Sequence, residues 1–381
     1  MFLNFNGGSP VYVALHPDLP EPPQYIVMHP IKKMLTRHQL LSKMIRPPVY
    51  ACIWILLKTE KLFALVADRI IRFSIPVFRR NSTYNRRIHQ LLSKTLSSER
   101  LTDKMVKQMR YYRIEVPASL ASSVFCRNTY CSQLQLPEWK INDKLSGIRL
   151  AKKLGLKTPR IYYEHTGVEQ IRPTHNMVIK PAKGSSGIGV FMSGTKGGIR
   201  ELNTGKHFNS WGEFLKAVRE MLSNNIIESD NWLAEELICQ EQGKPAVDFK
   251  FYTFYGKVGW ITEIIRFPEP KFHIMDGQGN TIDGGTYSKS QLFRGTGPTP
   301  SEIETARKVS LEIPAPFIRI DFLKGSDGMY FGEFTPRSGI IGSLPGKRDR
   351  EYGKMFHDAE ARLYDDLIGG KSFDTYRQIS S

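Results

Sequence analysis

Apolar and polar positions follow different patterns in the two parts of this chain. Nine apolar residues stand in a row from Val49 to Leu57, and from Lys58 to Arg72 charged residues interrupt the apolar ones at roughly helical spacing. The spacing predicts an amphipathic helix with a cationic side. The apolar run is shorter than the roughly 20 residues that span a bilayer. Such a helix fits either the core of a helical subdomain or an anionic lipid surface.

From residue 142 onward, short alternating segments are interspersed with segments of helical periodicity. The expected helices are 142–155, 210–224, 301–312 and 352–367. The expected strands are 159–165, 176–182, 188–193, 232–238, 248–255, 257–267, 317–323 and 329–335. Residues 117–130 are interpreted as a connection. This order predicts an α+β fold in which helices pack against antiparallel strands.

Charge is distributed as unevenly as hydrophobicity. Residues 31–113 hold 19 lysines and arginines against four acidic residues, so this region carries most of the chain's net charge of +17. A basic region of this kind favours an anionic partner, which could be membrane lipid, nucleic acid or a polyanionic substrate. The absence of an RNA-recognition motif argues against nucleic acid. Peripheral contact of residues 31–113 with an anionic membrane is therefore one open interpretation, and packing of these residues in an N-terminal helical subdomain is the other.

The cysteines and the N-terminus indicate the compartment. None of the four cysteines forms a C-x-x-C pair, which favours a reducing environment over a disulfide framework. The first 23 residues lack a basic segment followed by an apolar core, so we expect no secretory signal. These features predict a cytoplasmic protein, with possible placement at the inner membrane face.

A glycine- and serine-rich turn lies between two expected strands, in the segment VIKPAKGSSGIGV at 178–190. Glycines let backbone N–H groups point at an anion, and nearby lysines add positive charge. No helix follows the turn, so it is not the strand-to-helix phosphate loop. Taken alone, such a hairpin can also be purely structural. The candidate phosphate-covering residues are Lys180, Lys183, Gly184, Ser185, Ser186, Gly187 and Gly189.

Two acidic residues lie on neighbouring expected strands in FIRIDFLKGSDGMYFGEFT. Strand alternation places Arg319 and Asp321 on one face, and Glu333 on the next strand can reach it. Converging carboxylates suit Mg²⁺, which shares its coordination shell with substrate phosphates, and an adjacent arginine suits a transferring phosphoryl group. A solvated surface hairpin is the alternative, but the many apolar residues between the charges argue against it.

Further polar residues interrupt other apolar strands. Glu235 and Glu236 are adjacent, so one must face inward and needs a partner such as an adenine amino group. Lys250 shares a strand face with Asp248 and could reach a phosphate or a substrate acid. Arg337 begins a basic segment that could recognise an acidic substrate or be an ordinary loop.

In their order along the chain, NDKL, VIKPAKGSSGIGV, EEL, DFKF, R-I-D and G-E-F-T resemble the ATP-grasp superfamily. They are most similar to its TupA-like branch, named for teichuronopeptide biosynthesis, and to sugar-transfer-associated members. The resemblance runs from about residue 139 to 354. It implies an ATP-grasp fold, in which two α+β subdomains clamp ATP between antiparallel sheets. The implied parts are a basic helical region at 1–120, a subdomain with the Gly-rich loop at 121–235 and a subdomain with the metal site at 236–381.

The resemblance also implies roles for individual residues. Lys144 and Lys180 would contact the ATP phosphates, Glu235 would bind the adenine amino group, and the backbone at Leu237 and Ile238 would form the adenine hinge. Arg319 would stabilise the transferring phosphoryl group, and Asp321 and Glu333 would hold Mg²⁺. Thr335 occupies a position where many members have a metal-binding asparagine, so it is the weakest expected ligand. Glu241 is a candidate for the ribose, as is Gln242 beside it.

The implied reaction is that of a carboxylate–amine ligase acting through an acyl phosphate, with ATP and Mg²⁺ required. Its substrates would be an acid, small or sugar-linked, and an amine, in the biosynthesis of a bacterial surface polysaccharide or peptidyl polymer. Lys250 and Arg337 are candidates for catalytic contacts beside Arg319. Two alternatives stay open: a kinase that phosphorylates a sugar hydroxyl, and a non-catalytic nucleotide-binding protein on an anionic membrane or nucleic acid.

Overall fold

The computed structural model describes residues 118–380, apart from 131–133, 135, 185–186, 195–197 and 268. The basic segment at 31–113 and its expected amphipathic helix lie outside the described residues. Within the described ranges, no helix combines the length and apolar character needed to cross a membrane.

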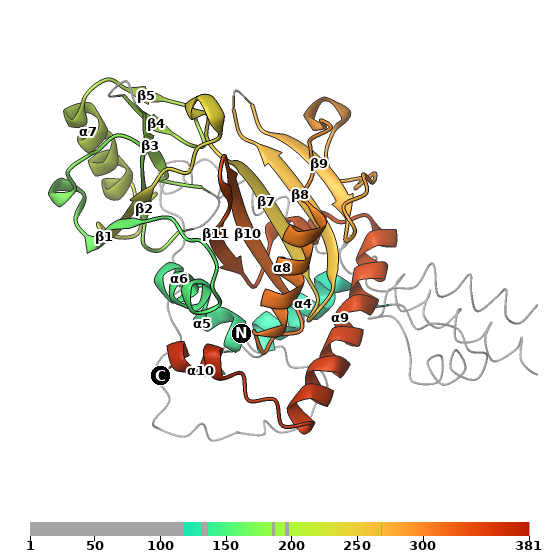
Figure 1. The fold of residues 1–381 in the computed structure, drawn as a ribbon. Coiled ribbons are helices and arrows are strands. Elements are labelled where there is room, and N and C mark those ends of the chain that lie inside the picture. The colour runs from blue at the N-terminus through green and yellow to red at the C-terminus, as the bar shows by residue number, and fades with distance from the viewer. Residues whose placement is uncertain are drawn as a thin grey trace, which may run out of the picture. The chain divides into compact units, whose positions relative to one another are not determined.

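Helices and two antiparallel sheets make up the described region, which confirms the expected α+β class (Figure 1). The helices are α4 (Leu120–Tyr130), α5 (Pro137–Lys140), α6 (Lys144–Lys153), α7 (Trp211–Ser223), α8 (Pro300–Leu311), α9 (Gly346–Ile368) and α10 (Asp374–Ser380). Short 3-10 turns lie at Val168–Gln170, Glu241–Gly243, Lys289–Gln291 and Gly339–Ser343.

The first sheet has the strand order β1-β6-β2-β3-β4-β5, and the second has β11-β10-β7-β8-β9. The first contains β1 (Ile161–Thr166), β2 (Met177–Pro181), β3 (Phe191–Ser193), β4 (Ile199–Glu201), β5 (His207–Phe208) and β6 (Trp232–Glu236). The second contains β7 (Val247–Thr253), β8 (Val258–Ile265), β9 (Lys271–Asp276), β10 (Ile318–Gly325) and β11 (Gly328–Thr335). Every neighbouring pair is antiparallel.

Each sheet has a hydrophobic core of its own. α7 packs against the first sheet through Phe214 and Val218, which are fully buried with Phe191 and Trp232. Figure 1 shows α7 on the side of that sheet away from the second one. α8 and α9 contribute to the larger core around the second sheet. Buried residues of α4 and α6 belong to this larger core as well. The predicted domain boundaries near residues 120 and 235 stay a prediction.

Local sequence explains where the helices begin. The Asp143 carboxylate accepts a hydrogen bond from the Ser146 N–H at 2.9 Å, which caps α6. The Ser210 hydroxyl caps α7 in the same way. At α8, Thr299 and Glu302 form a capping box, and Pro300 between them is the first helical residue. These three helices therefore begin within a residue or two of their expected positions.

The expected connection at 117–130 is wrong, because residues 120–130 form α4. Leu120 and Val124 are buried one helical turn apart, and the Asp349 carboxylate of α9 accepts a hydrogen bond from the Ala121 N–H at 2.9 Å. The many serines hid this helix, since serine has only modest helix propensity. Strand β9 was also missed, although its polar and apolar residues alternate over Lys271–Asp276.

Candidate functional site

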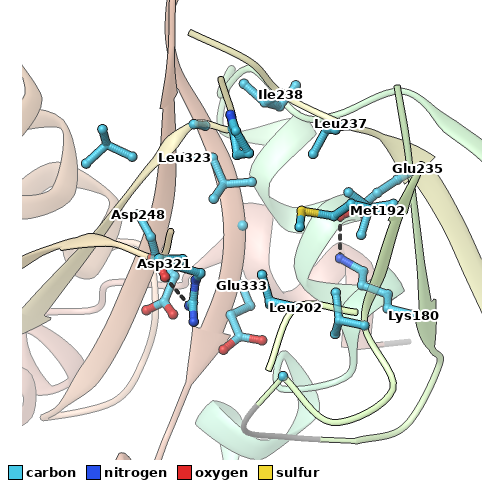
Figure 2. Close-up of a pocket in the computed structure, with 18 of the residues that line it drawn as sticks. Lys180, Met192, Leu202, Glu235, Leu237, Ile238, Asp248, Asp321, Leu323 and Glu333 are labelled. Atoms are coloured by element: carbon cyan, nitrogen blue, oxygen red, sulfur yellow. Dashed lines mark hydrogen bonds and ion pairs between the residues drawn. The ribbon is translucent and has the colours of Figure 1, made fainter. Parts of the chain in front are cut away.

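A cavity of about 530 Å³ lies between the two sheets, within the range of roughly 300 to 1,000 Å³ that small-molecule sites occupy. Figure 2 shows side chains from both sheets pointing into it. Its apolar lining includes Val178, Met192, Leu202, Leu237, Ile238 and Leu323. Its polar lining includes Lys144, Lys180, Glu235, Asp248, Lys250, Arg266, Asp321 and Glu333.

One end of the cavity combines apolar walls with the buried Glu235 of β6. Glu235 is in register with Val178 of β2, so both side chains share the sheet face toward the cavity. The Lys180 Nζ donates to the Glu235 Oε1 at 2.5 Å. Beyond β6, the Leu237 N–H donates to the Asn176 carbonyl and the Ile238 carbonyl accepts from the Ala246 N–H. The Leu237 carbonyl accepts a hydrogen bond from the Cys239 thiol at 3.5 Å.

Lys144, the first residue of α6, connects that helix to the Gly-rich loop. Its Nζ donates to the carbonyls of Pro181, Ala182 and Gly184 at 3.1–3.3 Å. Burial lowers the pKa of Lys144, and the positive charge of Lys180 lowers it further. An anion bound between the two lysines would relieve this repulsion.

The Gly-rich loop makes a tight turn back toward β3. Gly187 and Gly189 have φ angles of +71° and +69°, which favour glycine. A Cβ at Gly189 would lie 2.8 Å from Ile227 Cδ1, so close packing also requires the glycine. Gly184 and Gly187 line the cavity, whereas Gly189 is buried behind it. Ser185 and Ser186 lie outside the described residues.

The predicted acidic centre forms on β10 and β11. Asp321 and Glu333 are direct partners in the strand register. Arg319 joins them: its Nε and Nη2 donate to the two Asp321 oxygens at 2.6 and 2.7 Å, and Nη2 also donates to Glu333 Oε1 at 2.9 Å. The Thr335 hydroxyl accepts from Arg319 at 2.8 Å and donates to Glu333 at 3.2 Å. A fork-shaped guanidinium therefore holds both carboxylates in place.

A second ion-pair group on the same face begins at Lys250 of β7. Its Nζ donates to Asp321 Oδ2 at 2.5 Å and lies 3.3 Å from Asp248 Oδ1. Asp248 also accepts a hydrogen bond from Arg266, the residue that follows β8. Burial opposes the charge of Lys250, but Asp248 and Asp321 outweigh it and raise the pKa of this lysine. Lys250 thus stays cationic in a buried position.

The charges at this end of the cavity suit a magnesium–phosphate group. Partial burial opposes ionisation of Glu333. The positive charges of Arg319 and of the cavity lysines at 250, 180 and 144 outweigh this effect and lower the pKa of Glu333. Its side chain is 43% exposed, so it can still reach a ligand. Among the described residues, no group of three or more His, Cys, Asp or Glu side chains could hold a metal by itself. Two carboxylates with phosphate oxygens and water match the oxygen ligands of Mg²⁺.

The structure brings most of the predicted site residues together. Arg319 and Thr335 contact the carboxylates that line the cavity. Besides Arg319, Thr335 and the buried Gly189, the predicted residues outside the lining are Lys183, Glu236, Glu241 and Arg337. Of these four, Glu236 accepts a hydrogen bond from the Arg160 N–H at 3.2 Å, and the other three are exposed. Their roles stay predictions.

The sequence interpretation overlooked two arginines that line the cavity. Arg266 contacts Asp248, and Arg200 lies on the short strand β4. Neither stands in a recognisable motif, because the strand pairing that brings them to the cavity joins segments far apart in the chain. Asp248 itself could have been predicted as a site residue, since a buried acid two residues before Lys250 needs a cationic partner.

Comparison with solved structures returns ATP-grasp ligases at low similarity. The D-alanine–D-alanine ligase of Bacillus anthracis is 14% identical, with 69% of this chain and 77% of that chain covered and a TM-score of 0.36. The L-amino acid ligase of Bacillus licheniformis is 16% identical, with 63% and 53% covered and a TM-score of 0.35. The ATP-grasp ligase PsnB, complexed with minimal precursor, Mg and ADP, is 13% identical, with 62% of each chain covered and a TM-score of 0.34.

A search of curated proteins finds no significant match. The family comparison gives a clear result, because the model of the TupA-like ATP-grasp family matches residues 124–357. This range spans more than half of the chain and includes both sheets and the cavity between them. The chain therefore belongs to the TupA-like ATP-grasp family.

Proposed function

We propose that this protein is an ATP- and Mg²⁺-dependent ligase that activates a carboxylate as an acyl phosphate and joins it to an amine, releasing ADP and phosphate. The supporting observation is that four cations and two carboxylates are grouped along a single cavity. The cations are Lys144, Lys180, Lys250 and Arg319, and the carboxylates are Asp321 and Glu333.

ATP fits this cavity with its base at the apolar end. Adenine would lie between Met192 of the first sheet and Leu323 of the second, which Figure 2 shows facing the same space. Glu235 would accept from the amino group, and the peptide between Leu237 and Ile238 would pair with the base edge. The triphosphate would extend toward Lys144 and Lys180, whose repulsion it would relieve.

The residues at the other end suit phosphoryl transfer. A carboxylate is a poor electrophile, and phosphorylation gives it a good leaving group. Mg²⁺ held by Asp321 and Glu333 would neutralise charge on the phosphates. Arg319 and Lys250 would stabilise the charge on the γ-phosphoryl group as it moves to the substrate carboxylate. An amine would then attack the acyl carbon, lose a proton and displace phosphate.

The substrate class follows from the same chemistry. The exposed Arg337, just beyond β11, is a candidate contact for an acidic substrate. We propose an acid of a cell-surface polymer precursor, acted on in the cytoplasm, with the basic segment at 31–113 holding the protein near an anionic membrane.

Hydroxylamine trapping tests the ligase directly. Purified protein would be incubated with ATP, Mg²⁺, hydroxylamine and a panel of uronic and amino acids, and hydroxamate and ADP would be measured. Acid-dependent hydroxamate is expected from the wild type and not from Arg319→Ala. ADP release with a stable phosphosugar and no hydroxamate would support a sugar kinase instead. A complete lack of ATP turnover across the panel would contradict both enzymes.

A further inference from the structure

Arg319 has two kinds of hydrogen-bond partner. Asp321, Glu333 and Thr335, which accept from its Nε and Nη2, are also the expected ligands of Mg²⁺. Ser338 differs from these three, because its hydroxyl accepts from Arg319 Nη1 at 3.1 Å and it is not an expected ligand. A carboxylate oxygen that binds a metal ion is less available to Arg319. The bond to Ser338 does not depend on the metal.

The local structure at Ser338 shows that its side chain is committed to this contact. Ser338 is the N-cap residue of the 3-10 turn Gly339–Ser343, but its hydroxyl makes no capping hydrogen bond. A serine at such a position commonly accepts from a backbone N–H of the turn. Ser338 is only 5% exposed, so its hydroxyl needs a partner inside the protein. Arg319 is that partner.

Tyr252 supports the same contact from β7. It is in register with Arg319 of β10, so the two side chains are neighbours on one face of the sheet. A side-chain hydrogen bond joins the Tyr252 and Ser338 hydroxyls. The Tyr252 ring stacks on Trp260 with the centroids 3.8 Å apart, and Trp260 stacks in turn on Tyr352 of α9 at 4.4 Å. This stacking fixes the position of the phenol.

Tyr252 is suited to hydrogen bonding and not to proton transfer. Burial raises the pKa of its phenol despite the nearby positive charge of Arg319, so the group stays neutral. Tyr252 is also only 2% exposed, which leaves little of it open to a substrate. Its hydroxyl is therefore placed to orient its neighbours.

Arg319 keeps one donor for a ligand. A guanidinium has five N–H groups, and those of Nε and Nη2 are bonded to Asp321, Glu333 and Thr335. Ser338 accepts from one of the two on Nη1. The second Nη1 N–H has no acceptor in the part of the chain that the structure describes. The Arg319 side chain is 11% exposed, so a ligand can reach it.

We propose that Ser338 and Tyr252 are positioning residues that hold Arg319 in place for phosphoryl transfer when Asp321 and Glu333 bind the metal. The inference rests on the proposed role of Arg319 in the ligase. Tyr252 fixes the Ser338 hydroxyl, and Ser338 fixes Nη1 of Arg319. The remaining Nη1 N–H is thereby aimed at the charge of the moving phosphoryl group. Loss of either hydroxyl affects the transition state more than nucleotide binding.

Calorimetric binding tests this without turnover. MgADP alone represents the bound nucleotide, and MgADP with aluminium fluoride mimics the phosphoryl group during transfer. Ser338→Ala and Tyr252→Phe should bind MgADP with wild-type Kd. Both should bind the aluminium fluoride complex about 10-fold or more weakly, because a misplaced Arg319 loses contact with the mimic. Tyr252→Phe keeps the ring that stacks on Trp260 and removes only the hydroxyl.

Kinetics with the acid that gives the most hydroxamate provide a second measurement. Each variant should lower kcat by about 10-fold to 100-fold and leave the KM for ATP unchanged. Ser338→Thr keeps a hydroxyl and should retain most of the turnover. The double variant should resemble Ser338→Ala alone, because Tyr252 acts through Ser338.

The matched control is Tyr330→Phe, since the Tyr330 hydroxyl donates to Asp327 at the exposed tip of the β10–β11 hairpin. It should behave as wild type in both measurements, and thermal unfolding shows whether each variant is folded. Wild-type binding of the aluminium fluoride complex in folded Ser338→Ala and Tyr252→Phe would overturn the positioning role and leave the ligase proposal intact. Equal weakening of MgADP and of the aluminium fluoride complex would also overturn it. Failure of the wild type to bind MgADP would overturn both proposals.

Discussion

Lys250 and Asp321 face each other on the neighbouring strands β7 and β10, with Nζ and Oδ2 2.5 Å apart. The pair joins two charge groups, because Asp321 also binds Arg319 and Lys250 also lies near Asp248. Residues expected to bind phosphate and metal are therefore held in one network before either ligand arrives.

Replacing Lys250 by methionine should reduce turnover by about 100-fold or more, because a cation aimed at the transferring phosphate is lost. Stability should fall by less than the roughly 3–5 kcal/mol that an unpaired buried charge costs, since Asp248 keeps Arg266 and Asp321 keeps Arg319. Rates of ADP release and urea unfolding measure the two effects. Lys257→Met, at an exposed turn after β7, is the control. Full activity in Lys250→Met would contradict its role.

Changing Glu333 to glutamine should raise the Mg²⁺ concentration needed for half-maximal activity at least tenfold, because one of two carboxylate ligands is lost. Activity measured against Mg²⁺ concentration is the test. Asp327→Asn lies at the exposed tip of the same hairpin and should leave the curve unchanged. An unaltered Mg²⁺ curve in Glu333→Gln would exclude Glu333 as a ligand.

The Lys180–Glu235 pair should separate contacts to the base from contacts to the phosphates. Lys180→Met should weaken ATP binding at least tenfold and adenosine binding much less, because adenosine has no phosphate. Glu235→Ala should weaken both, because it removes a base contact. Calorimetric binding of the two ligands tests this, with the exposed Lys206→Met as control. Equal losses for ATP and adenosine in Lys180→Met would argue against a phosphate contact.

Asp276 should make folding stability depend on pH. Burial opposes its ionisation, but the Asn280 side chain and the N–H groups of the 278–280 turn outweigh burial and lower its pKa. Its stabilisation is therefore present above the unfolded-state pKa of about 3.9 and lost as pH falls through the lower folded value. Urea unfolding should show Asp276→Asn less stable than wild type by about 1 kcal/mol at pH 7. The difference should shrink below about pH 4, and a constant difference would contradict this assignment.

The sequence was sufficient to predict the elements that depend on local pattern. Helical periodicity predicted the starts of α6 and α8 to within two residues, and in the structure Asp143 and Thr299 cap these starts by satisfying nearby backbone groups. The two-residue alternation of β10 placed Arg319 and Asp321 on one face. Antiparallel pairing across a short turn then brought Glu333 opposite Asp321. For these residues local geometry alone constrains the arrangement.

Tertiary structure decided which distant segments meet. Helix α4 depends on burial against α9, which its serine-rich sequence does not reveal. The Lys180–Glu235 pair joins residues 55 positions apart, and the Arg200–Phe267 pair joins β4 to the segment just beyond β8. The physical reason is that the two-residue alternation of side chains along a strand determines which face of the sheet a residue occupies. Which side chain of another segment lies opposite it depends on strand order and on the packing of the two cores.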